Sequence, residues 1–392
     1  MLQLVAFRAL QGVGAGAMFA IPYTILGVIY PPDRRGRAIG LGSSVWGISS
    51  VVGPVLGYAI VSTLSWRWVF YLSVPIGIAA IVLVHTALEE TTGGVESHVD
   101  YAGALVLSVG VGAFLVGLQL VESGVTTTAL ALLGVGVVGL VAFVFVERRA
   151  RSPILPLSLF DDQVFVATNA TGFLTSFVLF AAITYVPLYM QSVRGGAGSA
   201  AIAVFPLSIG WSGTAIVSGR LVNRVGERRL VAAGTVLMAL SFAWATTWTA
   251  TTSTAVVVAN VFAMGVSMGA LTPPLLTAIQ NHLGASQMGL ATSSQQFFRN
   301  LGGTMGVALL GFLMNYTIRG RLASIPGVSN LGDLQRLLLG SGTPPAGLPP
   351  VMADGLTTVF TVSVFVALLA VGFALYIPRL DAGSPAPQTA DD

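Results

Sequence analysis

Long apolar stretches separated by short polar segments dominate the chain. A helix needs about 20 residues to cross the hydrocarbon core of a bilayer. Because lipid offers the backbone no hydrogen-bond partners, each such stretch is expected to be a helix. The pattern therefore predicts an all-α polytopic membrane helical bundle with about eleven spans, near residues 2–29, 38–63, 69–88, 101–121, 126–146, 164–190, 200–222, 230–249, 255–279, 289–318 and 356–377.

Composition supports a membrane protein and narrows its chemistry. Of 392 residues, 54% are hydrophobic and 8% are charged, whereas about a quarter of the residues in soluble domains are charged. The chain has no cysteine, and its three histidines are scattered over loops and span ends. We find no catalytic constellation, metal-ligand spacing or phosphate-loop motif. We therefore expect no enzyme, no metal, no cofactor and no nucleic-acid partner.

Arginines mark one side of the predicted bundle. All 18 basic residues are arginine, and three groups of them fall in loops on one side if the spans alternate in direction. The positive-inside rule makes that side cytoplasmic and places the C-terminus there. The hydrophilic segment 319–354 is then an outer loop, and the tail after residue 378 is expected to be disordered. The three groups are Arg34, Arg35 and Arg37; Arg148, Arg149 and Arg151; and Arg224, Arg228 and Arg229.

The first predicted span carries an unusual charge. Arg8 is the only charged residue in this span, and a central arginine costs roughly 2.5–3.5 kcal/mol on insertion scales. Helical spacing places Arg8 and Gln11 on one face, so we expect both to turn into the bundle. Gly12, Gly14 and Gly16 leave the adjoining face open to a closely packed neighbour. The alternative is an arginine satisfied by helix carbonyls or by Gln11.

A weak internal repeat divides the chain. Four positions recur with an offset of about 250 residues, which is the mark of two related halves. The offset inserts two extra helices between the halves and leaves the first half three helices shorter than the second. The repeated positions are Gly14, Pro22, Gly36 and Gly53, which match Gly265, Pro273, Gly289 and Gly306.

This repeat predicts a domain division. We expect residues 1–90 to be the remainder of an N-terminal six-helix half and 91–150 an inserted linker helix pair. Residues 151–318 would then be the first five helices of the C-terminal half. The segment 319–354 would be the extracytoplasmic loop, and 355–392 the last span with its disordered tail.

Several motifs occur together in an informative order. They run from Arg8 to Gly16, Arg34 to Arg37, Gly53 to Gly57, Trp66 to Phe70, Pro187 to Gln191, Gly219 to Arg229 and Arg299 to Gly303. In this order they resemble the major facilitator superfamily, and more narrowly the fourteen-span drug:proton antiporters of the EmrB/QacA type. The resemblance covers nearly the whole chain and begins in what would be the family's fourth helix. It implies a major facilitator fold that apparently lacks the first three helices.

The resemblance gives Arg8 an expected role. Arg8 matches the arginine that the family places in its fourth helix, where it is implicated in proton movement. A cation held in low dielectric favours the ionised form of a nearby acid and repels a second cation. Arg8 and Gln11 are therefore candidates for proton coupling or substrate binding.

Gly53, Pro54 and Gly57 resemble the family's antiporter motif. Proline cannot donate its backbone hydrogen bond, so the helix is expected to bend at Pro54. Gly53 and Gly57 are spaced for close packing against another helix. Ser49 and Tyr58 stand where the motif has glycine, and a static kink is the alternative to a moving one.

The segment 219–229 resembles the second-half copy of the family's cytoplasmic gating loop. Asn223 replaces the family's aspartate. Asparagine still caps a following helix but lacks the charge, so we expect a weaker latch. The alternative is that the arginines only anchor the topology. The candidate gating residues are Gly219, Arg220, Asn223, Arg224, Gly226 and Arg229.

Polar and aromatic residues of the second half are candidates for lining a cavity near the membrane midplane. Amide, aromatic and methionine side chains accept varied amphipathic compounds without fixed hydrogen-bond geometry. Packing within the bundle is the alternative for each residue. The candidates are Asn169, Thr175, Tyr185, Trp211, Asn260 and Met264.

The resemblance implies a secondary active transporter of the cell (plasma or inner) membrane. It would export small amphipathic compounds or drugs in exchange for protons, with the proton gradient as the energy source. A nutrient symporter usually has twelve spans, so the inserted helix pair argues against one. No acidic residue lies in the middle of a span, because Glu89, Glu122 and Glu147 fall at span ends. The alternative is therefore a truncated, non-transporting or partner-dependent member of the same family.

Overall fold

The computed structural model describes residues 2–88, 99–123, 125–194, 197–284, 287–322 and 347–378. These residues form eleven α-helices and one short 3-10 helix, η1 (Leu157–Asp161). Each predicted span coincides with one helix, so the all-α bundle of about eleven spans is confirmed. The helices are α1 (Leu2–Ile29), α2 (Pro32–Thr63), α3 (Trp68–Ala87), α4 (Tyr101–Ser123), α5 (Thr127–Glu147), α6 (Gln163–Arg194), α7 (Ala197–Val225), α8 (Glu227–Ala245), α9 (Thr254–Leu283), α10 (Met288–Leu322) and α12 (Leu348–Tyr376).

Nine of the described helices are long and apolar enough to cross a membrane. The chain is therefore a multi-pass membrane protein. The predicted domain division stays a prediction. Most of the predicted outer loop and almost all of the predicted tail lie outside the described residues.

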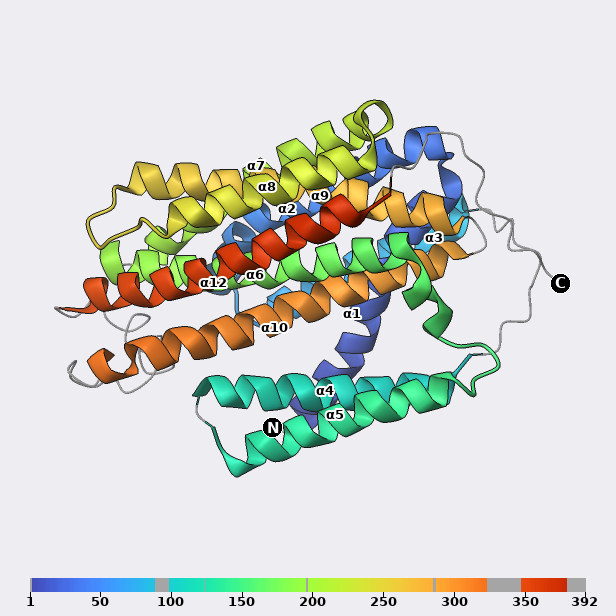
Figure 1. The fold of residues 1–392 in the computed structure, drawn as a ribbon, viewed down its shortest axis with the longest axis horizontal. Helices are drawn as coiled ribbons and strands as arrows, with labels where there is room; N and C mark the ends of the chain where they lie inside the picture. Colours follow the sequence, from blue (N-terminus) through green and yellow to red (C-terminus); the bar gives the residue numbers. More distant parts are fainter. Residues whose placement is uncertain are drawn as a thin grey trace.

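The helices form a main bundle and a separate hairpin (Figure 1). The bundle consists of α6–α10 and α12, with α2 packed on α7 and α9. The hairpin of α4 and α5 lies along one side of the bundle, where α4 contacts α10. Successive helices alternate in direction, so the connections α1–α2, α5–α6 and α7–α8 lie at one end of the molecule. We call this the arginine-rich end.

The buried core lies in the main bundle. Aromatic side chains close it near the end opposite the arginines. Trp248, in the connection between α8 and α9, stacks on Tyr189 of α6 with ring centroids 5.8 Å apart and meets Phe360 of α12 edge-on at 5.2 Å. The hydroxyl of Tyr189 donates to the carbonyl of Thr249 at 2.7 Å. By contrast, no described residue of α3 is buried. The main bundle therefore supplies the packed scaffold on which α1 and α2 rest, and α3 packs on α2.

Glycines bring the helices of the main bundle into backbone contact. A Cβ on Gly302 or Gly306 of α10 would overlap the carbonyl groups of Phe173 and Phe177 on α6. Gly210 of α7 approaches α9 equally closely, since its Cβ would lie 2.5 Å from the Phe262 carbonyl oxygen. Lipid supplies no hydrophobic force between helices, so such small-residue contacts hold membrane bundles together.

This packing predicts opposite effects for two matched glycine substitutions. Gly306→Ala places a methyl group against the Phe177 backbone, and overpacking of this kind costs about 1–3 kcal/mol. Gly372→Ala, at an exposed site on α12 with nothing within 4 Å of the new Cβ, is expected to be neutral or stabilising by about 0.5–1 kcal/mol. Thermal unfolding in detergent measures both, and equal melting temperatures would contradict the predicted packing.

Candidate functional site

Helices α2 and α7 approach backbone to backbone at the arginine-rich end. A Cβ on Gly40 would lie 2.6 Å from the carbonyl oxygen of Ala215, and one on Gly219 would overlap the carbonyl of Gly36. Gly47, further along α2, faces α7 in the same way. These helices belong to the two predicted halves of the chain. The crossing is therefore a contact between the predicted halves in which only small side chains, such as those of Val222 and Ser212, lie against the α2 glycines.

The glycine contacts of α2 with α7 do not extend to Gly53 and Gly57. Positions Gly53 and Gly57 have no heavy atom within 4 Å of an added Cβ, and Leu56 is 50% exposed. In the described part of the chain, the glycine-mediated contact is thus confined to the arginine-rich part of α2. The two halves are closed on each other at that end.

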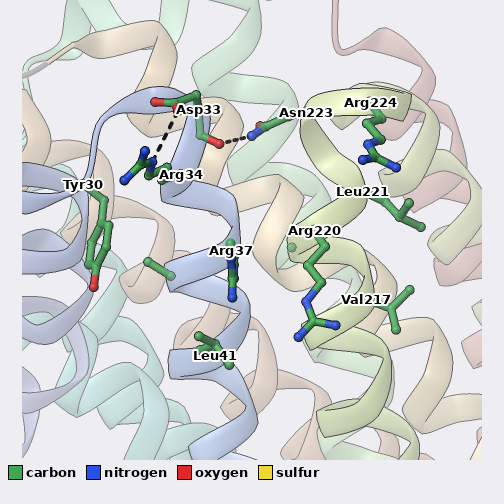
Figure 2. Close-up of a pocket in the computed structure, with 12 residues that line it drawn as sticks. Tyr30, Asp33, Arg34, Arg37, Leu41, Val217, Arg220, Leu221, Asn223 and Arg224 are labelled. Atoms are coloured by element: carbon green, nitrogen blue, oxygen red, sulfur yellow. Dashed lines mark hydrogen bonds and ion pairs between the residues drawn. The ribbon is translucent and has the colours of Figure 1, made fainter.

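A groove lies over this crossing (Figure 2). It has a volume of about 910 Å³. The side-chain amide of Asn223, in the last turn of α7, donates to the carbonyl of Asp33 at the start of α2. Arg34 pairs with the Asp33 carboxylate at 3.7 Å, but both side chains are exposed, and such pairs contribute little stability. Four arginines make the groove basic: Arg34, Arg37, Arg220 and Arg224.

A second polar link joins three helices beside the groove. Arg35, in the first turn of α2 and ahead of its apolar part, is buried and donates to the Asn281 side chain of α9 at 2.6 Å. Asn281 in turn donates to the Glu227 carboxylate of α8 at 3.4 Å. Burial lowers the pKa of the Arg35 guanidinium, because removal from water disfavours the charged form. The link ties α2 to the main bundle through a neutral amide.

Two buried glutamines hold α1 against the bundle. Gln280 of α9 donates to the carbonyl of Tyr23 at 3.1 Å and to the hydroxyl of Thr292 at 2.8 Å. Gln296 of α10 donates to the carbonyl of Phe19 at 2.8 Å. These glutamines were not among the predicted site residues. The signal that would have found them is an amide inside an apolar span, where an unpaired polar group is costly.

Arg299 of α10 is also buried. Its guanidinium lies over the Trp211 ring of α7, at 5.8 Å from the ring centroid. This distance is within the range of a cation–π contact. The chain therefore places a buried arginine of α10 against α7.

Residues 1–307 match the sequence profile described as Major Facilitator Superfamily. The chain belongs to this family. The expected family fold is thereby confirmed, whereas the fourteen-span subtype and the absence of three helices stay predictions.

Relatives of this major facilitator chain are named as transporters. The multidrug transporter protein MdtP of Bacillus subtilis is 35% identical over 321 residues, which cover 80% of this chain and 59% of that protein. The MFS-type transporter Rv1877 of Mycobacterium tuberculosis is 32% identical, over 96% of this chain and 56% of its own. Multidrug resistance protein 3 of Bacillus subtilis is 27% identical, over 99% of this chain and 80% of that protein. The chain thus spans less than two thirds of the length of the first two.

Among solved structures, a bacterial homologue of the human lysosomal transporter Spinster, in an inward-facing and occupied conformation, is similar. The aligned region covers 92% of this chain and 91% of the Spinster homologue, with 14% sequence identity and a TM-score of 0.47.

The predicted gating loop of this major facilitator chain lies at the crossing. Gly219 makes the close contact, and Arg220, Asn223 and Arg224 line the groove. The expectation that Asn223 caps the next helix is wrong. Asn223 lies inside α7 and donates to α2, while Gly226 is the N-cap of α8, with a φ of 88° that favours glycine. Arg229, the remaining predicted gating residue, is exposed on α8.

The predicted residues of α1 and of the antiporter-like motif lie at the exposed margin of the structure. Arg8 and Gln11 are exposed, and the Arg8 guanidinium donates to the Gln11 amide oxygen at 3.2 Å. The expectation that both turn into the bundle is therefore not met by the described residues, and their role stays a prediction. Gly12, Gly14 and Gly16 have no close neighbour either. Helix α2 continues through Pro54 to Thr63, so the motif does not interrupt it.

The six predicted cavity residues do not meet in one site. In the part of the chain that the structure describes, the groove over α2 and α7 and the cavity beside Gln296 are lined by other residues, and the small void of about 10 Å³ beside Met264 includes one of the six. Asn169, Thr175, Tyr185 and Asn260 are buried and donate to helix carbonyls. The Trp211 ring lies under the guanidinium of Arg299. Packing within the bundle thus accounts for most of them in this conformation, and a substrate role stays a prediction.

The hydrogen bond from Asn223 to the Asp33 carbonyl predicts different behaviour for asparagine and aspartate at position 223. Asn223→Asp removes the donor that reaches the Asp33 carbonyl, so it should weaken closure of α2 on α7 by about 0.5–1.5 kcal/mol. The chain has no natural cysteine, so Leu41→Cys and Val217→Cys, at exposed positions on the groove, report closure by their cross-linking rate. Asn223→Asp should lower this rate.

The matched control is Gln287→Glu, which makes the same amide-to-acid change at an exposed position of the same end. It should leave the cross-linking rate unchanged. An equal rate in all three proteins would show that Asn223 does not latch the helices.

Proposed function

We propose that this chain works as a secondary active transporter that exports small amphipathic compounds in exchange for protons. The observation that carries the proposal is the similarity of the chain to a relative named as a multidrug transporter, at 35% identity over 80% of this chain. The proton gradient as energy source follows from the resemblance to drug:proton antiporters. Such a carrier needs no cofactor, and its partners are the lipid bilayer, the substrate and protons.

The crossing of α2 and α7 supports an alternating mechanism. Its interface is formed largely by the backbone at Gly36, Gly40 and Gly219, with the Val222 side chain against Gly36. Helices that touch in this way separate without unpacking a core, because few dispersion contacts are lost. Closure at the arginine-rich end, with Asn223 as the latch, corresponds to a state in which that side is sealed.

Orientation follows from the arginine-rich end. We place this end in the cytoplasm of a cell with the transporter in its plasma or inner membrane, because loops rich in arginine stay on the cytoplasmic side. The C-terminus is then cytoplasmic, and the sealed state described above faces outward. Export requires this state to exchange with one that opens to the cytoplasm.

A partner-dependent protein is the second candidate. The observation that favours it is the exposure of α1 and α3: Phe7 and Leu10 are each 70% exposed, and no described residue of α3 is buried. Lipid covers such faces in a membrane, but a further protein segment would cover them as well. This candidate predicts no transport by the chain alone.

Proteoliposomes that contain the chain and a fluorescent amphipathic dye test the two candidates. An imposed proton gradient should drive dye movement, and an ionophore that collapses the gradient should abolish it. Dye movement that persists without the gradient would exclude proton exchange. No dye movement at all would favour the partner-dependent protein.

A pair of substitutions on α7 links transport to the crossing. Gly219→Ala adds a methyl group against Gly36 and Gly40, whereas Gly213→Ala meets nothing within 4 Å. Gly219→Ala should destabilise the sealed state and lower the transport rate on the order of tenfold. Gly213→Ala should transport like the unmodified chain, and equal rates for both variants would remove α2 and α7 from the mechanism.

A further inference from the structure

Two carboxylates meet at the base of the α4–α5 hairpin. Asp100 directly precedes α4, and Glu147 is the last residue of α5. Glu147 is 3% exposed, and it is the one buried acid among the acidic side chains whose burial the structure describes. The pair lies at the arginine-rich end, where the chain leaves the hairpin for the main bundle. It is not part of the groove over α2 and α7.

Each carboxylate has one bonded and one free oxygen. Asp100 Oδ1 accepts from the backbone N–H of Gly103 at 2.8 Å, and Glu147 Oε1 accepts from the backbone N–H of Leu155 at 2.5 Å. The other two oxygens, Asp100 Oδ2 and Glu147 Oε2, are buried and have no hydrogen-bond partner in the described chain. Buried polar atoms without partners are rare and call for an explanation.

The two free oxygens face the same small space. An added Cβ on Gly103 would lie 3.1 Å from Glu147 Oε2 and still closer to Asp100 Oδ2. Because glycine has no Cβ, this space is open between the oxygens. A side chain at position 103 would fill it.

No cation among the described residues neutralises the pair. Neither carboxylate forms an ion pair, and the nearby Arg148, Arg149 and Arg151 are exposed. Two further charged pairs lie at this end: His282 with Asp162, bonded at 2.7 Å, and Arg34 with Asp33 at 3.7 Å. Two adjacent carboxylates that are shielded from water cannot both carry a charge at low cost, and such pairs take up one proton.

We propose that Asp100 and Glu147 form a proton-binding site that holds one proton between their free oxygens. The proton turns one free oxygen into a donor and leaves the other as its acceptor. A divalent metal fits the site poorly, since Ca²⁺ takes six to eight oxygens and Mg²⁺ needs an octahedral shell. The described residues also contain no group of three acidic or histidine side chains suited to a metal ion. The site does not rest on the proposed transport function.

The proton would control how the hairpin is fastened to the bundle. Glu147 binds the backbone of Leu155, and the Leu155 side chain packs on the cluster that contains Phe165 and Ile279 of α6 and α9. Loss of the proton leaves two facing negative charges, and their repulsion weakens the Glu147–Leu155 contact. The segment between the hairpin and α6 is thus loosened as the pH rises.

Infrared difference spectroscopy of the whole chain in nanodiscs tests the site directly. The carbonyl stretch of a protonated carboxylic acid should be present at low pH and disappear as the pH rises. Glu147→Gln should remove this band. Asp100→Asn, which removes the neighbouring charge, should move the loss of the band to lower pH, with a proton affinity reduced on the order of tenfold.

Asp161→Asn is the matched control, because Asp161 is an exposed acid at the same end. It should leave the band unchanged. A band that is absent in the unmodified chain, or that persists in Glu147→Gln, would overturn the proposal. If Glu147→Gln does not fold, Asp100→Asn decides alone: a shifted titration supports the shared proton, and an unshifted one refutes it. A band that changes with calcium or a chelator, but not with pH, would make the pair a metal site instead.

Discussion

Close backbone contact between helices is the constraint on which this structure depends. In lipid, apolar side chains gain little by moving from acyl chains to protein, so association relies on tight van der Waals packing. The main bundle achieves this where glycines of one helix meet carbonyl groups of the next, as between α10 and α6. The interface between α2 and α7 uses the same device. One mechanism of packing therefore serves both the main bundle and the contact that opens in the proposed transport cycle.

Polar groups then decide which helices are held and where. Gln280 and Gln296 fasten α1 through its carbonyl groups, and the Arg35–Asn281–Glu227 link fastens the start of α2. Each of these bonds reaches across an interface that glycine or apolar packing has already brought together. In a dry interior a hydrogen bond is stronger than in water, and an unmade one is more costly. The side-chain amides of Gln280, Asn281 and Gln296 thus fix how α1 and α2 are positioned along the main bundle.

The sequence was sufficient to place the helices but not to orient their faces. The apolar runs located each α-helix that the structure describes, because length and hydropathy are properties of the chain alone. Which side of a helix is inside depends on its neighbours, and a helix that is apolar all round carries no periodic signal of this. Arg8 was therefore expected inside but is exposed, and Asn260 and Tyr185 were expected at a cavity but pack between helices. Asn223 was expected to cap the N-terminus of the helix that follows it. Its long-range bond to Asp33 depends on a crossing that local spacing does not reveal.

The unequal lengths of the helices have a consequence for the surrounding bilayer. At 1.5 Å per residue, α8 with its 19 residues spans about 29 Å, whereas the 35 residues of α10 span about 52 Å. The short helix matches a hydrocarbon layer of about 30 Å, so α10 has to tilt or project beyond it. Membrane thickness therefore affects the two helices differently. A thicker bilayer exceeds the length of α8 first, and a thinner bilayer increases the tilt of α10 against α6.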